Sequence, residues 1–249
     1  MLTCVPLLVW QGLYYPYTTT EAFFVMGLIE LLVLISLWLV YLHPQYRPRF
    51  TWVTIAFFAF VAILALASLL GVDPVLSFWS SFDRLTGVVF WVHLLILFPV
   101  AGVVLQTKID WQRFFLCSIS VGAIVALRHL LSLAGLDESW LVERSGGIGN
   151  STFFGVYIFF QFLFCLLLLA WSSTRVLVYA TLVAIVMLLA LYGSEAQGVL
   201  FASLGGLVLL CALLAIAWGR KHPSLRVVGL SILVMLLASF LFLSWRLAD

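Results

Sequence analysis

The stretch AFFVMGLIELLVLISLWLVYL (residues 22–42) decides the fold class of this chain. It is about as long as the ~20 apolar residues that an α-helix needs to cross a bilayer. Glu30 is its only charged residue. A segment in lipid has to satisfy its own backbone hydrogen bonds, so we expect a helix and not a strand.

Similar stretches occur along the whole sequence. Of its 249 residues 65% are hydrophobic and 9% are charged, whereas a soluble domain carries about 25% charged residues. Apolar runs bounded by Pro, Gly or charged residues lie at 2–15, 22–42, 51–70, 88–105, 114–134, 151–171, 176–191, 199–218 and 227–245. We therefore predict an all-α polytopic bundle of about nine transmembrane helices, which forms a single domain over residues 1–249.

The positions of Lys and Arg predict the orientation, because cytoplasmic loops carry an excess of both. One set of loops holds eight of the twelve: Arg47, Arg49, Lys108, Arg113, Arg175, Arg220, Lys221 and Arg226. The opposite set holds three, Arg84, Arg144 and Arg246. This places the N-terminus in the cytoplasm and the longer loops 71–87 and 136–150 outside. We therefore look for chemistry on the outer face.

Several functional classes are disfavoured by the sequence. A net charge of +2 is too small to indicate a nucleic-acid partner. The four cysteines form no CxxC pair and the four histidines are dispersed, so neither a disulfide framework nor a metal site is expected. No serine lies in a nucleophile elbow.

The outer loop GVDPVLSFWSSFDRLTG (residues 71–87) combines aromatic residues with Arg84. Trp and Phe of this loop suit the membrane interface, which is one interpretation. The other is an amphipathic segment on the outer leaflet that presents Arg84 to a lipid head group.

The outer segment RSGGIGNST (residues 144–152) leads directly into an apolar stretch. Gly147 and Gly149 would let backbone amides approach a ligand, Asn150 can cap the following helix, and Arg144 can donate two hydrogen bonds to phosphate. Since a helix N-terminus favours anions, this segment is a candidate anion site. A flexible turn with an ordinary cap remains the alternative.

Three ionisable residues form a predicted buried polar layer: Glu30, His93 and Arg128. Glu30 and Arg128 lie roughly 10–13 Å below the outer surface at 1.5 Å per residue. Because charges in a bilayer usually pair, we expect a Glu30–Arg128 ion pair with His93 or His129 nearby. Alternatively, Arg128 extends to the interface. The pair would be structural or would line a substrate cavity.

The order of motifs along the chain resembles the bacterial O-antigen ligase and polymerase family of multi-spanning membrane glycosyltransferases. The resemblance begins at YPYT (15–18), is most specific at 71–87 followed by His93, and continues through Arg144 and GIGN (147–150). YGSEAQG (192–198) stands where the family usually has a T-G-S/T-R-G motif, with Gln197 in place of the usual Arg.

The resemblance implies glycan transfer from undecaprenyl diphosphate to lipid A-core, a growing polymer or a protein, on the periplasmic face of the bacterial inner membrane. Donor and membrane lipid are the implied partners, and neither a nucleotide sugar nor a metal nor another cofactor is needed. The implied substrate-binding residues are Arg84, Arg144, Gly147, Gly149, Asn150 and Gln197, while no catalytic residue is identified. Family members carry a long outer loop after about this many helices. We therefore expect residues 1–249 to be the front part of a longer enzyme and to be inactive alone.

Two other functions stay open. Intramembrane Glu30 and Arg128 would suit a transporter or flippase for a lipid-linked glycan. Alternatively, the chain is a non-catalytic membrane partner.

Overall fold

The computed structural model describes residues 2–10, 12–48, 51–136, 144–171 and 173–219, with the backbone alone at 2, 144, 171, 207 and 210–219. Helices are the only regular elements in these ranges, so the all-α prediction is confirmed for them. In chain order they are η1 (Leu2–Leu7), α1 (Thr18–Leu42), η2 (Pro44–Tyr46), α2 (Trp52–Leu69), α3 (Pro74–Trp79), α4 (Val88–Val104), α5 (Lys108–Leu133), η3 (Arg144–Gly147), α6 (Ser151–Trp171), α7 (Thr174–Gly193) and α8 (Gln197–Gly219).

Five described helices are long and apolar enough to cross a membrane, namely α1, α2, α5, α6 over Ser151–Ala170, and α7. Helix α4 is also apolar but has only 17 residues. The membrane character of the chain therefore has structural support, whereas the predicted count of about nine spanning helices does not.

The predicted first span, residues 2–15, is not a spanning helix. In the described part of this range, residues 2–10 and 12–15, the one regular element is the six-residue 3₁₀ helix η1, which contains Pro6, and turns follow it. Pro6 lacks an amide hydrogen and Gly12 and Pro16 disfavour a continuous helix, which explains the break. Without this span, the argument for a cytoplasmic N-terminus has no support. The predicted ninth helix, 227–245, lies outside the described residues.

Side chains next to the helices explain where several of them begin. In α2, Thr51 accepts a hydrogen bond from the Thr54 amide at 3.3 Å and completes a capping box. In α5, Thr107 accepts from the Asp110 amide at 3.2 Å in the same arrangement. Each cap satisfies amides that otherwise have no partner within the helix.

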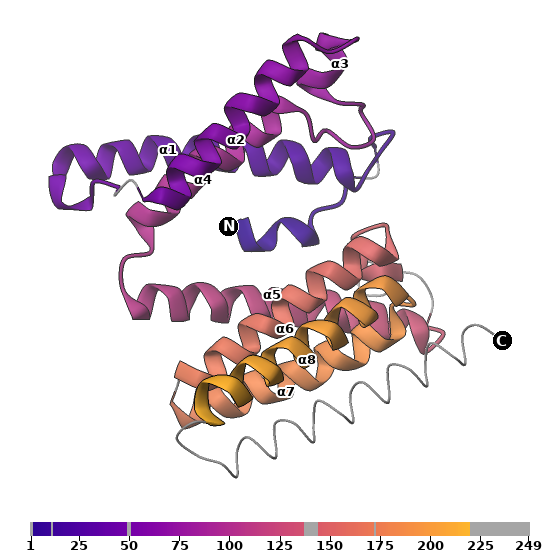
Figure 1. The fold of residues 1–249 in the computed structure, drawn as a ribbon. Helices are drawn as coiled ribbons and strands as arrows, with labels where there is room; N and C mark the ends of the chain where they lie inside the picture. The colour runs from indigo at the N-terminus through magenta and orange to yellow at the C-terminus, as the bar shows by residue number, and fades with distance from the viewer. Residues whose placement is uncertain (1, 11, 49–50, 137–143, 172, 220–249) are drawn as a thin grey trace.

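The described helices pack in two groups (Figure 1). Helix α4 packs against α1 and α2 in the first group, while α5, α6 and α7 pack against one another in the second, with α8 against α6. The short helix η1 contacts both α1 and α5. The fully buried apolar residues concentrate in the second group, which holds Ile119, Val125, Phe154, Ile158 and Met187. This group therefore forms the main core.

Candidate functional site

A cavity of about 790 Å³ lies between α1, α3 and the start of α4. Its walls are mainly apolar and aromatic, with Asp73, Ser80 and Ser81 as polar members. The other lining residues are Phe23, Met26, Val75, Leu76, Trp79, Phe82, Leu85, Val89 and Phe90. Such a wall suits an apolar chain better than a sugar, because few polar groups are available to replace its water.

Helix α3 forms one wall of this cavity, and the local sequence explains its position. The Asp73 carboxylate accepts a hydrogen bond from the Leu76 amide at 2.9 Å, and Pro74 occupies the first helical position. Ser80 then adopts a left-handed conformation with φ of 68°, which ends the helix. A Cβ atom at Gly87 would overlap the backbone of Phe78, so glycine is needed where α3 approaches the start of α4.

Arg84 follows α3 in the connection to α4, and its side chain is 77% exposed. Its Nε atom lies 3.8 Å from the Asp83 carboxylate, which forms a loose surface ion pair. Two residues earlier, the Phe82 carbonyl accepts a hydrogen bond from the Thr19 hydroxyl at 3.0 Å. This hydrogen bond fixes the Arg84 segment beside the first turn of α1.

The glycine-rich turn of η3 packs closely against α5. Ser145, Gly146 and Gly147 adopt positive φ values of 55°, 62° and 93° and are buried. Arg128 is only 2% exposed, and its Nη1 atom donates to the Gly146 carbonyl at 3.0 Å. The Ser145 amide donates to Nδ1 of His129 at 3.3 Å. Glycines therefore allow the turn to meet two polar side chains of α5.

The residues after the turn connect it to α6 and α1. Asn150 Oδ1 accepts from the amides of Thr152 and Phe153 at 2.8 and 3.3 Å, so the predicted cap of α6 forms. A Cβ atom at Gly149 would lie 2.7 Å from the Tyr17 ring. Gly149 and Asn150 are exposed, Gly147 is buried, and the Arg144 side chain lies outside the described residues. The Asn150 side chain thus already accepts hydrogen bonds from two amides at the start of α6 that a bound anion would need.

The start of α1 brings the two predicted outer segments together. Thr19 contacts the Arg84 segment, and Tyr17, only two residues away, contacts Gly149 after η3. The α7–α8 turn lies at the same end of the bundle, because Gly193 meets Leu133 at the end of α5. Gln197 is exposed there as the first residue of α8, and its amide donates to the Glu195 carbonyl at 3.0 Å.

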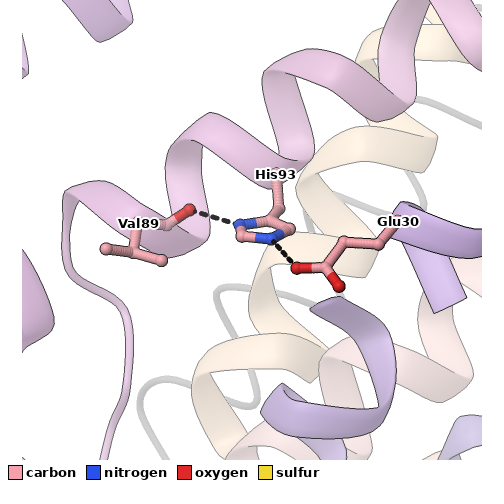
Figure 2. Close-up of polar contacts among 3 residues, drawn as sticks. All are labelled: Glu30, Val89 and His93. Atoms are coloured by element: carbon pink, nitrogen blue, oxygen red, sulfur yellow. Dashed lines mark hydrogen bonds and ion pairs between the residues drawn. The ribbon is translucent and has the colours of Figure 1, made fainter. Parts of the chain in front are cut away.

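Glu30 pairs with His93 and not with Arg128, so the predicted ion pair is wrong. Figure 2 shows His93 of α4 pointing toward Glu30 of α1, with 3.2 Å between Nε2 and Oε1. On its other side, Nδ1 lies 2.7 Å from the Val89 carbonyl oxygen. Arg128 belongs to the second helix group, where it binds η3. Similar depth in the membrane did not make Glu30 and Arg128 neighbours, because their helices are not packed together.

Two features of this region were missed from the sequence. The first is the cavity beneath α3, although Asp73-Pro74 is a recognisable helix start. The second is the contact of Arg128 and His129 with the η3 turn, for which the sequence offers no local signal. The described residues contain no group of three or more His, Cys, Asp or Glu side chains that could hold a metal ion.

Comparison of the chain with protein-family models, with curated proteins and with solved structures gives no match.

Proposed function

We propose that this chain binds a lipid-linked glycan at the α3 end of the bundle and serves transfer of the glycan to an acceptor, as in the O-antigen ligase and polymerase family that its motifs resemble. The donor is of the undecaprenyl diphosphate type. In this proposal the α3 end faces the periplasm across a bacterial inner membrane, and lipid A-core, a growing polymer or a protein accepts the glycan.

The observation that carries the proposal is the apolar cavity next to an exposed cation. About 790 Å³ of mainly apolar space can take part of a polyprenyl tail, and Trp79 and Phe82 in its wall suit the membrane interface. Arg84 lies between the lining residues Phe82 and Leu85 and is exposed. A lipid diphosphate needs this combination of an apolar slot and a cation at its opening.

One helix start adds to the attraction for an anion at this end. The first turn of α4 lies beside the segment 80–87, and Gly87 has no side chain to cap it. Its amide end carries partial positive charge that favours a diphosphate. The first turn of α1 carries the acidic Glu21, and its Thr19 amide already donates to the Tyr15 carbonyl at 3.3 Å, so α1 adds no such attraction.

In this proposal the other predicted substrate-binding residues position the donor or add contacts to it. The η3 turn, held by Arg128, fixes Gly149 and Asn150 beside α1, and the exposed Gln197 can donate a hydrogen bond to the glycan. Arg144 would be the second cation for the diphosphate.

Donor binding tests the proposal. The full chain in nanodiscs is titrated with undecaprenyl diphosphate and, as a tail-only probe, with undecaprenol. Arg84→Gln should weaken diphosphate binding about 10- to 100-fold, which corresponds to ~1.5–3 kcal/mol for a charged hydrogen bond, and should leave undecaprenol binding unchanged. Arg113→Gln, which removes an exposed arginine at the opposite end of the helices, is the matched control.

Equal diphosphate affinity of wild type and Arg84→Gln would contradict the proposal. Movement of the lipid-linked glycan between leaflets of liposomes, without transfer to an acceptor, would instead support the flippase alternative.

A further inference from the structure

The Glu30–His93 contact joins α1 to α4 at the next helical turn beyond the cavity. Glu30 is twelve residues after Thr18, which corresponds to about 18 Å along α1. Met26 and Val89, each four residues before a member of the pair, line the cavity. The pair therefore lies one helical turn farther into the span, on the faces of α1 and α4 that meet.

The contacts of His93 determine which atoms carry protons. The Val89 carbonyl oxygen can only accept, so Nδ1 of His93, at 2.7 Å, must be the N–H donor. In a neutral imidazole Nε2 then has a lone pair and no hydrogen. An ionised Glu30 carboxylate also only accepts, and two acceptors cannot form the contact of 3.2 Å. The contact therefore requires one additional proton between Nε2 and Oε1.

This proton has two possible locations with the same total charge. It belongs either to an imidazolium that donates to a carboxylate or to a carboxylic acid that donates to a neutral imidazole. The pair is electrically neutral in both forms. That neutrality matters because the Glu30 side chain is 70% exposed on a membrane-spanning helix, where a lone carboxylate would face lipid at high cost.

The described neighbours offer no other charge that could replace the proton. Helix α2 carries no titratable side chain, and His93 is the sole one on α4. The remaining titratable groups on α1 itself are Glu21 and Tyr41. The other elements packed against α1 and α4 contribute Cys4 on η1, Tyr46 on η2 and the α3 cap Asp73. Glu21 and Tyr41 lie nine and eleven residues from Glu30 along α1, roughly 13–17 Å away.

We propose that Glu30 and His93 form a site that binds a single proton within the membrane span. The bound proton joins α1 to α4 beneath the cavity that both helices line. Its loss leaves a carboxylate and an imidazole lone pair facing each other, which separates the two side chains and loosens the helix contact under the cavity. The site does not depend on the identity of the cavity's ligand.

The imidazole tautomer gives the first test. Nitrogen NMR of ¹⁵N-histidine-labelled full chain in nanodiscs distinguishes Nδ1–H from Nε2–H, and His93→Gln identifies the His93 signals by their loss. We expect Nδ1 of His93 to carry a hydrogen at neutral pH. A neutral His93 with hydrogen on Nε2 alone, the tautomer that free imidazole side chains favour, would overturn the proposal.

Carbodiimide labelling gives the second test and needs no variant to fold. Dicyclohexylcarbodiimide reacts with protonated carboxyl groups that are reachable from an apolar phase, and peptide mass spectrometry locates the adduct. We expect an adduct on Glu30 at neutral pH and none on Asp110, whose carboxylate accepts hydrogen bonds from the Thr107 amide and hydroxyl at the start of α5. Glu30→Gln should abolish the adduct while retaining a donor to Nε2. Absence of the adduct together with imidazolium ¹⁵N shifts would place the proton on His93 and still support the site. Labelling of Glu30 no greater than that of Asp110, together with the ¹⁵N shifts of a neutral His93, would overturn the proposal, because neither residue would then hold the additional proton.

Discussion

Gly147→Ala tests the packing of the η3 turn against α5. Gly147 has a φ of 93°, which costs a residue with a Cβ atom about 1–2 kcal/mol. The new Cβ atom would lie 2.7 Å from Nη1 of Arg128, so the guanidinium has to shift, and we expect it to lose its hydrogen bond to the Gly146 carbonyl. Loss of a hydrogen bond from a charged donor costs ~1.5–3 kcal/mol. The expected loss in the free energy of unfolding is therefore roughly 2.5–5 kcal/mol.

The two contributions can be separated in a double-mutant cycle with Arg128→Ala. Without the guanidinium the overlap disappears, so Gly147→Ala should then cost only the backbone share of ~1–2 kcal/mol. The assay is SDS-induced unfolding in mixed micelles, followed by modification of Cys165, which is fully buried on α6. Gly102→Ala is the control because its Cβ atom meets nothing within 4 Å, and it should change stability by less than about 1 kcal/mol.

Equal costs of Gly147→Ala in the two backgrounds would refute this reasoning. The turn would then be strained by its backbone alone, and Arg128 would not hold it in place.

Three further predictions concern single contacts and topology. Asn150→Ala removes the cap of α6 and should lower the free energy of unfolding by about 1 kcal/mol in the same assay; no change would mean that water replaces the cap. Ser118 donates to Gln161 Oε1 at 3.0 Å in the buried core, so Ser118→Ala should cost ~1–3 kcal/mol, and a neutral result would contradict that hydrogen bond. In a background without native cysteines, Ser81→Cys should react with a membrane-impermeant maleimide on intact cells, whereas Gln106→Cys should react only after permeabilisation; the reverse pattern would invert the proposed orientation.

The long apolar runs predicted the spanning helices well. The expected ranges 51–70 and 151–171 compare with Trp52–Leu69 and Ser151–Trp171 in the structure. Apolar length is a strong signal because a lipid-embedded backbone has few alternatives to a helix. The prediction of a spanning helix over residues 2–15 was wrong because it rested on length and hydrophobicity. It did not take into account that Pro6 and Gly12 disfavour a continuous helix.

Pairing between helices could not be predicted in the same way. Counting residues from the end of a helix predicts how deep a residue lies in the membrane, and this count gave Glu30 and Arg128 similar depths. It does not say which helices are neighbours, and α1 packs against α4, so His93 is the partner of Glu30. The structure of the candidate anion segment 144–152 was predicted only in part. The predicted Asn150 cap of α6 forms. The burial of Gly147 against Arg128 was not predicted, because it depends on a contact between residues far apart in the sequence.

The location of a bound polyprenyl diphosphate tests the central proposal most directly. A photoactivatable undecaprenyl diphosphate analogue is crosslinked to the full chain in nanodiscs, and the adducts are mapped by peptide mass spectrometry. We expect adducts on the cavity wall, at Met26, Trp79 or Phe90, which are lost in competition with unlabelled undecaprenyl diphosphate. Competable adducts confined to α6 and α7, with none on these wall residues, would contradict it.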